Sequence, residues 1–516
     1  MSAAVAVEPR AGPFGQPRAL YVLFFAEMWE RFSFYGMRAL LIFYLTRHFL
    51  FDDATATGIF ATYGALVYLT PVLGGLVADR WLGFRKAVVF GAVLLCLGHF
   101  GMALEGDPAH LSGADVVRDA RSLEVFYASL ALIIVGVGFL KASISSIVGA
   151  LYAPGDRRRD AGFSIFYVGI NLGASLAPFV CGYLGETYGW RYGFGLAGVG
   201  MLAGLVTFLR GRDLLAGAGE PPSAARLAEP VYGISRERWI YVVGLGSVAV
   251  AWALMQQRAL VGNLLSLTAV VAVGAIAVYA VRKLERIERD RLFVVLYLTA
   301  VSVVFWSLFE QAGSSLNLFA DRNVDRVVLG ATIRASLLQS LNPLFILALA
   351  PCFSWLWNRL ARADREPSAP TKFGLGVVQV ALGFVALVVG ARLADHGIVA
   401  LGWLVLAYLL HTTGELCLSP VGLSMVTRLS VPRVVGLMMG VWFLSSAFAQ
   451  YVAGLIAAGA SVVRAPGAAV NASASLPIYV ATFGSIAKTG ALIGLVVLAI
   501  APIVRRFMHD DAHSGT

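Results

Sequence analysis

The chain has 516 residues, of which 59% are hydrophobic and 14% are charged, and its mean hydropathy is +0.77. This composition excludes a soluble globular protein of this size and indicates a polytopic membrane protein embedded in a lipid bilayer. The formal net charge of +10 does not point to a nucleic-acid partner, because the basic residues fall mostly in short segments between apolar stretches.

The first apolar stretch, Tyr21 to Tyr44, is long enough to cross a bilayer as a helix. It contains four charged residues: Glu27, Glu30, Arg31 and Arg38. At about 100° per residue, these four side chains share one helical face. Because a charge at the bilayer centre costs about 2.5–3.5 kcal/mol, we expect this face to line a protein interior or a water-filled cavity, as in a transport or proton pathway.

Further apolar stretches of membrane-spanning length follow along the chain. They run approximately over residues 58–78, 87–104, 125–151, 162–183, 193–209, 239–254, 260–281, 292–318, 337–357, 373–391, 399–426, 435–458 and 478–503. We therefore expect an all-α fold with fourteen transmembrane helices, arranged as six, two and six. The middle two contain almost no charge and are expected to be peripheral and lipid-facing.

Loop composition predicts the domains and the orientation. The expected segments are a tail (1–19), a six-helix bundle (20–210), a linker with two extra transmembrane helices (211–291), a second six-helix bundle (292–505) and a tail (506–516). The basic loops alternate onto one side, which the positive-inside rule assigns to the cytoplasm together with both termini. The first nineteen residues hold no cleavable signal, so we expect a multi-pass protein of the cell (inner) membrane that retains its first helix.

The loop between the second and third expected helices carries a recognisable pattern. Small residues from Gly74 allow close helix contact, and Asp79, Arg80 and Lys86 can pair across the ends of neighbouring helices. The simpler interpretation is a tight basic loop. However, the spacing G-x-x-x-D-R-x-x-G-x-x-K, which includes Gly83, resembles the loop signature of the major facilitator superfamily. This resemblance implies two six-helix bundles and a role for the loop in gating.

Ionisable residues deep inside the expected helices divide unevenly between the two halves of the chain. They are Glu27, Glu30, Arg31, Arg38, Lys141, Glu310 and Glu415. All three cations belong to the first half, and the second half contributes only acids. A cavity between the halves would therefore suit a zwitterion, with its carboxylate near the cations and its ammonium near the acids. Asn171 and Asn342 also lie within helices and can bond an amide or amine.

Several segments together resemble one family, the proton-dependent oligopeptide transporters, a branch of that superfamily. The segment Glu27-x-x-Glu30-Arg31-Phe32-x-Phe34-Tyr35 resembles the family motif E-x-x-E-R-F-x-Y-Y. Further matches begin at Gly138, Phe163, Phe305, Gln339 and Gly414. The resemblance extends from about Phe14 to the last helix and implies a proton-coupled symporter that imports di- and tripeptides by alternating access, with protons as the coupling ion and no cofactor. At Phe34 the chain departs from the motif, which puts one hydrogen bond of the family's tyrosine in doubt.

The resemblance also implies roles for single residues. Arg31, Arg38 and Lys141 would hold the peptide carboxylate. The amino terminus would lie near Asn171, Asn342 and Glu415. Side-chain pockets would involve Tyr35, Tyr68, Trp306, Trp442 and Ser446, and Glu310 would alternate between Lys141 and Arg38 in the gate.

Proton coupling follows from the spacing of the charges on the first helix. Arg31 lies one turn from Glu27 and reaches toward Glu30, so one cation stabilises both carboxylates. When a peptide carboxylate takes Arg31, a freed glutamate in a low-dielectric site takes up a proton. Glu27 and Glu30 are the expected proton acceptors, and Glu310 is a second candidate.

Simpler interpretations remain open for individual residues. Arg38 can snorkel from a helix end, Glu415 can cap a break at Ser419-Pro420, and the asparagines and tryptophans can serve packing alone. The alternative functions are a carrier for another small anion such as nitrate, or a drug exporter. A membrane-embedded enzyme is disfavoured because the chain lacks H-E-x-x-H and G-x-S-x-G patterns.

The cysteines give no sign of a metal site or a disulfide framework. Cys96, Cys181, Cys352 and Cys417 are widely spaced inside apolar segments, and we expect them to be small buried residues. We also expect the protein to be a monomer.

Overall fold

The computed structural model describes residues 12–509 except 114, 154, 432, 466 and 469. Residues 1–11 and 510–516, which make up most of the two expected tails, lie outside the described residues. Over the described part of the chain, thirteen helices are long and apolar enough to cross a membrane. Helix α1, Arg18–Phe43, is another long helix, distinguished from these by its charged residues. Together they confirm the predicted all-helical architecture of six, two and six long helices.

The chain forms two compact units: unit 1 is built from the first half of the sequence, whereas unit 2 contains parts of both halves. Unit 1 comprises Met1–Leu40, Leu69–Pro108 and Arg118–Gln256, and unit 2 comprises Leu41–Tyr68, Ala109–Val117 and Gln257–Thr516. The end of α1 and the beginning of α2, Asp53–Val77, therefore belong to unit 2. The domain boundaries expected from the sequence remain a prediction.

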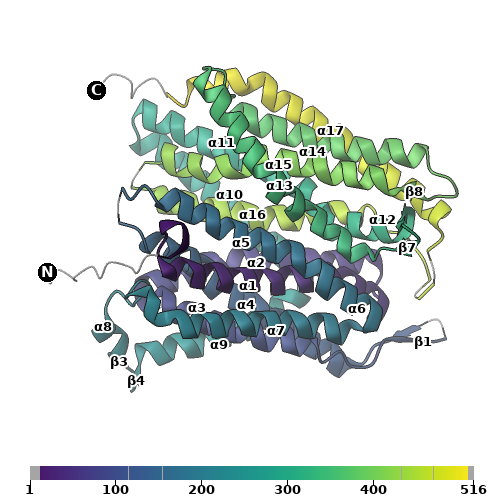
Figure 1. Cartoon of the computed structure of the whole chain (residues 1–516), viewed down its shortest axis with the longest axis horizontal. Coiled ribbons are helices and arrows are strands. Elements are labelled where there is room, and N and C mark those ends of the chain that lie inside the picture. Colours follow the sequence, from purple (N-terminus) through teal and green to yellow (C-terminus); the bar gives the residue numbers. More distant parts are fainter. Residues whose placement is uncertain are drawn as a thin grey trace. The chain divides into compact units, whose positions relative to one another are not determined.

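Unit 1 is a bundle in which α3 packs against α4 and α7, and α9 packs against α4 (Figure 1). Besides most of α1 and the end of α2, its elements are η1 (Pro13–Gly15), η3 (Ala78–Leu82), α3 (Phe84–Met102), α4 (Ala120–Ala150), α5 (Arg159–Ala177), η4 (Pro178–Gly182), α6 (Tyr183–Tyr188), α7 (Trp190–Gly211), η5 (Arg212–Leu215), α8 (Ala224–Ala228), β3 (Pro230–Val231), β4 (Ile234–Ser235) and α9 (Arg236–Gln256).

Unit 2 has its densest packing between α14 and its neighbours α15 and α17. Its remaining elements are η2 (Tyr44–His48), β1 (His110–Ser112), β2 (Asp115–Val117), α10 (Arg258–Lys283), α11 (Arg286–Phe309), η6 (Glu310–Gly313), α12 (Ser315–Asn323), β5 (Val324–Asp325), β6 (Val327–Val328), β7 (Ala331–Thr332), η7 (Ala335–Ser340), α13 (Leu341–Arg362), α14 (Ala369–Arg392), β8 (Val399–Ala400), α15 (Leu401–Leu429), α16 (Val435–Ala458) and α17 (Ala472–Arg506).

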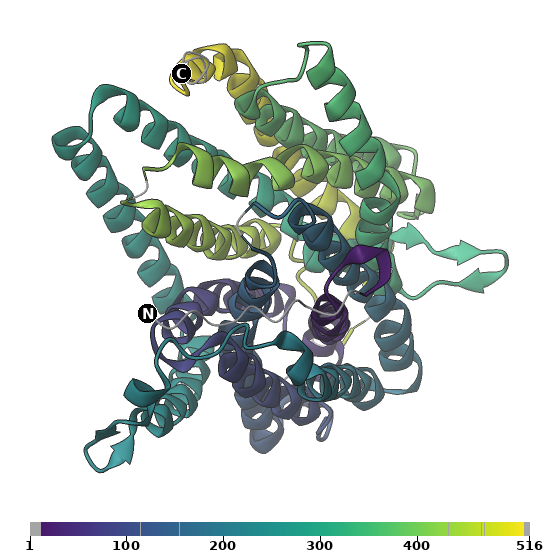
Figure 2. The same cartoon turned by 60° about the vertical axis from the view of Figure 1, so that its left-hand side comes forward.

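The few strands form short two-stranded pairs outside the long helices. β1 with β2, β3 with β4, and β6 with β7 pair antiparallel as hairpins, whereas β5 and β8 pair parallel. The β6–β7 hairpin, in green, projects from the helices of unit 2 (Figure 2). These strands connect helices and do not build a sheet core.

Two expectations need correction, and one is supported. The expected helix over 292–318 is interrupted by η6. Glycine and serine at 313–315 weaken the helix there, and the side chain of Gln311 forms hydrogen bonds to the backbone at the interruption. The part of the linker between α7 and α9 contains η5, α8 and the β3–β4 hairpin. Cys352 is exposed, whereas the other three cysteines are buried. Helices α9 and α10 are largely exposed: only 17% of the most apolar stretch of each helix is buried, as expected for peripheral helices.

Candidate functional site

A buried charge cluster lies on α1 in unit 1. The Nε atom of Arg31 lies 3.0 Å from Oε1 of Glu27 and 2.5 Å from Oε2 of Glu30. Glu27 is 3% exposed, Glu30 is 0% exposed and Arg31 is 5% exposed, so water has little access to these three side chains. The predicted pairing of one guanidinium with two carboxylates is confirmed. Lys141 of α4 adds a second cation within electrostatic range of Glu27.

Small residues let neighbouring helices approach this cluster closely. A Cβ atom at Gly173 of α5 would lie 2.1 Å from the carbonyl oxygen of Met28, so α5 contacts the backbone of α1 directly. A Cβ at Gly74 of α2 would lie 2.2 Å from the carbonyl oxygen of Gly138, one turn before Lys141. These glycines therefore bring α5 to α1 and α2 to α4, which is how membrane helices use small residues.

The aromatic residues after the cluster pack around it. The guanidinium carbon of Arg31 lies 5.6 Å from the ring centroid of Phe34, within cation–π range. Phe34 is 4% exposed and meets Tyr35 edge to face at 5.3 Å. Phe34 thus offers Arg31 a ring face, and the hydroxyl expected from the family motif is absent from this position.

Three further predicted site residues of unit 1 differ in their surroundings. Asn171 is buried, and its Nδ2 donates to the carbonyl oxygen of Tyr167, one turn earlier in α5, over 3.0 Å. Tyr35 is half-buried and packs against the small core of α1, η4 and α7 around Phe32. Arg38 is half-buried on α1. The Asn171 amide is thus partly engaged within its own helix.

A second polar cluster lies in unit 2 between α13 and α15. Asn342 donates from Nδ2 to Oε2 of Glu415 over 2.9 Å and to Oγ1 of Thr412 over 3.1 Å. Glu415 is 9% exposed, and Glu310, which is 5% exposed, lies within electrostatic range of it. Glycines again set the spacing, since Gly376 and Gly414 bring α14 against α15. The structure therefore joins Asn342 to Glu415 and places Glu310 within electrostatic range of Glu415, and the binding role of these residues stays a prediction.

Sequence reasoning missed Gln311, the residue that bridges the interruption after α11. Its Nε2 donates to the carbonyl oxygens of Ser307 and of Ala453 in α16, each over 3.0 Å, and its Oε1 accepts from Ser315 over 2.6 Å. Because Gln311 is fully buried, these bonds fix the turn that carries Glu310. An interrupted membrane helix of this kind often lines a binding site. The glycine and serines after Glu310 were the available signal.

The other predicted residues of unit 2 are aromatic or hydroxyl side chains. Trp306 is half-buried and meets Phe305 and Phe309 edge to face at 5.2 Å. Trp442 of α16 packs on Gly422 of α15, where a Cβ would lie 2.4 Å from the indole. Ser446 donates to the carbonyl oxygen of Trp442 over 3.5 Å, and Tyr68 is half-buried on α2.

Sequence reasoning also missed a buried ion pair between Asp53 and Arg322, both in unit 2. The Arg322 guanidinium donates from Nη1 and Nη2 to the two carboxylate oxygens of Asp53 over 2.5 and 2.8 Å. Arg322 also donates to the hydroxyl of Tyr479, and the backbone NH of Val462 donates to Asp53. The pair joins the beginning of α2 to α12 and α17, so it links parts of both halves of the sequence. Asp53 and Arg322 lie far apart in the sequence, and no local pattern predicts their pairing.

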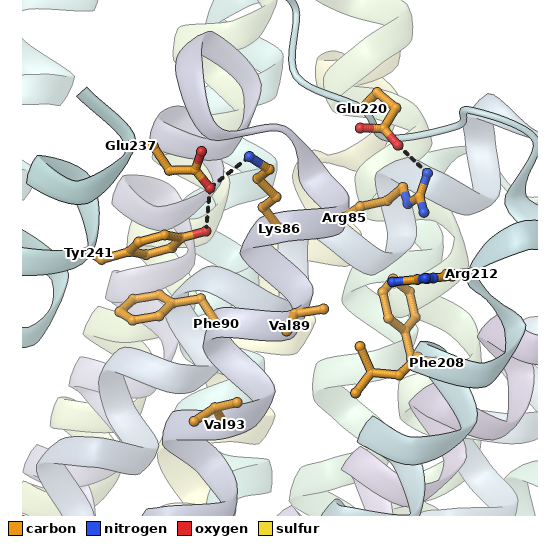
Figure 3. Close-up of a pocket in the computed structure, with 11 residues that line it drawn as sticks. Arg85, Lys86, Val89, Phe90, Val93, Phe208, Arg212, Glu220, Glu237 and Tyr241 are labelled. Atoms are coloured by element: carbon orange, nitrogen blue, oxygen red, sulfur yellow. Dashed lines mark hydrogen bonds and ion pairs between the residues drawn. The ribbon is translucent and has the colours of Figure 1, made fainter. Parts of the chain in front are cut away.

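The signature loop between α2 and α3 borders a pocket of about 500 Å³ in unit 1 (Figure 3). Lys86 pairs with Glu237 of α9 over 2.7 Å, and Tyr241 donates to the same carboxylate oxygen. Arg85 pairs with Glu220 of the linker. The linker therefore holds both basic residues at the beginning of α3, as Figure 3 shows.

The remaining residues of this loop take different positions. Gly83 has φ +80°, and a Cβ there would lie 2.5 Å from the backbone nitrogen of Pro221. The linker can therefore approach this position closely only because the residue is glycine. Asp79 and Arg80 are exposed in η3.

In the part of the chain that the structure describes, fourteen long helices with buried ionisable clusters define a polytopic membrane carrier. Comparison with known proteins identifies its kind. The POT family model matches residues 85–471. The chain is 40% identical to the peptide transporter YePEPT of Yersinia enterocolitica, covering 86% of this chain and 88% of that protein. It is 33% identical to dipeptide and tripeptide permease A of Erwinia pyrifoliae, covering 96% of each.

Solved structures agree with this match. A crystal structure of a peptide transporter in complex with alafosfalin superposes with a TM-score of 0.80 at 37% identity, covering 97% of this chain and 98% of that one. A POT family transporter in complex with 5-aminolevulinic acid gives a TM-score of 0.79 at 31% identity, covering 96% and 98%. The chain belongs to the POT family, a branch of the major facilitator superfamily, and is a transporter rather than an enzyme.

Proposed function

We propose that this protein is a proton-coupled symporter that imports di- and tripeptides by alternating access. The observation that carries the proposal is the buried cluster on α1, in which the single guanidinium of Arg31 serves both Glu27 and Glu30. The peptide transporter of Yersinia enterocolitica and the dipeptide and tripeptide permease of Erwinia pyrifoliae, to which the chain is similar, support peptides as the substrate class.

Competition for Arg31 couples peptide binding to protonation. In the absence of substrate, the ion pairs stabilise Glu27 and Glu30 as carboxylates in a site from which water is excluded. A peptide carboxylate that binds Arg31 withdraws this stabilisation, and a proton then neutralises Glu30 or Glu27. Glu310 is a second candidate for the proton. A neutral zwitterionic peptide that enters with one proton carries net positive charge, so an inside-negative potential adds about 2.3 kcal/mol per 100 mV to uptake.

The two polar clusters suit the two ends of a peptide. Arg31, Arg38 and Lys141 hold the carboxylate, and Glu415, Asn342 and Asn171 hold the amino group. The hydrogen bond from Asn342 to Glu415 supports this arrangement, because it fixes one carboxylate oxygen and leaves the other to accept from an ammonium. Side chains of the peptide lie near Tyr35, Tyr68, Trp306, Trp442 and Ser446.

Alternating access requires contacts that open and close at the two ends of the site. Asp53 and Arg322 join the beginning of α2 to α12 and close the outer end when paired. Glu310 alternates between Lys141 and Arg38 in the gate. At the opposite end, the loop of Asp79, Arg80, Gly83 and Lys86 acts in gating. The basic loops and both termini face the cytoplasm, and the protein acts as a monomer in the cell membrane.

Uptake of a labelled dipeptide into proteoliposomes tests the function. With an inward proton gradient, accumulation above equilibrium that an uncoupler removes is expected. Equilibration without accumulation would contradict proton coupling, and absence of dipeptide uptake alongside uptake of nitrate would favour a small-anion carrier instead.

A further inference from the structure

Lys488 lies at the centre of the exposed face of α17. The opposite face of α17 is buried, at Phe483, Gly490 and Gly494, and packs against α14. At 100° per residue, Lys488 lies on the other side, together with the exposed residues Leu492 (63%) and Leu495 (58%). In Figure 1, α17 (yellow) runs beside α14 at the edge of unit 2. This face of α17 is therefore directed at lipid.

The packing against α14 gives the membrane depth of Lys488. A Cβ at Gly490 would lie 3.2 Å from Cβ of Ala381, and one at Gly494 would lie 2.6 Å from Cγ2 of Val378, so the two helices run antiparallel with a defined register. Lys488 is thus level with Gly383 of α14. The charged ends of α14, Lys372 and Arg392, are about 16 and 13 Å away along the helix at 1.5 Å per residue. Lys488 therefore lies near the middle of a hydrocarbon layer about 30 Å thick.

This position is unfavourable for the protein alone in a bilayer. In the part of the chain that the structure describes, Lys488 forms no hydrogen bond and no ion pair. Its four-carbon side chain is too short to bring the ammonium group to either membrane surface by snorkelling. Ionisable residues in membrane helices normally face the bundle interior and pair with one another. Lys488 therefore requires an acidic partner from outside the chain.

We propose that the face of α17 around Lys488 binds a membrane-spanning helix of another protein that carries Asp or Glu at mid-membrane. Ala481, Ser485 and Thr489 lie beside Lys488 at intervals of four residues, and such small residues permit close helix approach and hydrogen bonds across helices. A second copy of the chain is unsuitable, because its α17 would present another lysine. Among the described residues, no exposed Asp or Glu lies at this depth, so no other face of a second copy supplies the acidic partner. Lipid headgroups do not reach the middle of the bilayer.

Energy transfer in nanodiscs tests the proposal. The acceptor dye is placed on Cys352, which is the exposed one of the four cysteines. The probes are three donor-labelled leucine-rich transmembrane peptides that differ only in a central Asp, Asn or Leu. The wild type is expected to bind the Asp peptide at least tenfold more tightly than the Leu peptide. Lys488→Arg retains this preference, whereas Lys488→Gln loses it.

Two matched measurements separate docking from a structural role. Lys283→Gln, at the basic end of α10, is expected to keep the preference for the Asp peptide. Without peptide, Lys488→Leu is expected to raise the midpoint of thermal unfolding in nanodiscs, because the substitution removes an unpaired charge from the lipid. Dipeptide uptake is expected to stay unchanged. Equal binding of the three peptides, a preference that survives Lys488→Gln, or a lower unfolding midpoint in Lys488→Leu would overturn the proposal.

Discussion

Nε of Arg31 lies 2.5 Å from Oε2 of Glu30, whose side chain has no exposed surface. The same nitrogen lies 3.0 Å from Oε1 of Glu27, so one guanidinium is the ion-pair partner of two buried carboxylates. Removing a single partner from a buried ion pair leaves an uncompensated charge. Any ligand that takes Arg31 therefore changes the protonation of its neighbours, and this relationship links substrate binding to proton movement.

Glu30→Gln is expected to abolish uphill accumulation of dipeptide and to preserve counterflow between peptide-loaded vesicles and labelled peptide outside. Glutamine retains the shape of the side chain but takes up no proton. Tracer uptake with and without a proton gradient measures both properties. Asp213→Asn, at an acid whose side chain is 90% exposed, serves as the control and should behave as wild type. Uphill accumulation in Glu30→Gln would exclude Glu30 as the coupling residue.

Lys141→Ala is expected to weaken binding of dipeptides with a free carboxylate by about 10- to 100-fold, the equivalent of one hydrogen bond to a charged group. Peptides with an amidated carboxyl end should bind nearly unchanged, because they offer no negative charge. Competition against a labelled dipeptide gives the two affinities. Equal losses for both kinds of peptide would show that Lys141 acts on folding or gating and does not hold the carboxylate.

Glu415→Gln is expected to weaken binding of peptides with a free amino group while N-acetylated peptides bind as before. Glutamine can still accept the hydrogen bond from Asn342, so the cluster keeps its geometry and loses only its charge. The same competition assay measures both affinities. If affinity for the N-acetylated peptides falls equally, the assignment of the amino-group site to Glu415 is wrong.

Asp53→Asn is expected to lower the free energy of unfolding by about 3–5 kcal/mol, because Arg322 loses its buried partner. The double variant Asp53→Arg with Arg322→Asp should recover part of this loss. Thermal unfolding in detergent measures both changes. Arg47→Gln is the matched control: its side chain is 39% exposed, and its partner Asp321 also binds Arg326, so the expected change is below about 1 kcal/mol. A larger loss for Arg47→Gln than for Asp53→Asn would contradict this account.

The architecture and the α1 cluster were predictable because both depend on short-range patterns. Apolar length predicts each membrane helix, and the spacing of Glu27 and Arg31 by one helical turn predicts their ion pair. The positions of Glu310 and Glu415 inside expected helices also predicted that both acids are buried, as the structure shows. In each case the physical cause is local or compositional, so one sequence contains it.

Long-range contacts and the interruption of the helix at Glu310 were not predictable. Asp53 and Arg322 meet only because α2 and α12 pack in one unit, and the interruption at Glu310 depends on bonds from Gln311 to Ala453 in another helix. These two features arise from tertiary packing, which propensity and spacing do not encode. Lys488, in contrast, lies near the centre of the expected helix over 478–503, so the expectation that the second half contributes only acids was wrong. The register of α17 with α14 agrees with this depth.

The central claim is that peptide and proton enter together through the Arg31 cluster, and internal pH measures this most directly. Proteoliposomes loaded with a pH-sensitive dye, without an imposed gradient, receive a dipeptide outside. The account predicts internal acidification that follows peptide entry in the wild type and is absent in Glu30→Gln. Peptide entry without acidification in the wild type would contradict proton coupling, and undiminished acidification in Glu30→Gln would contradict the role of the cluster.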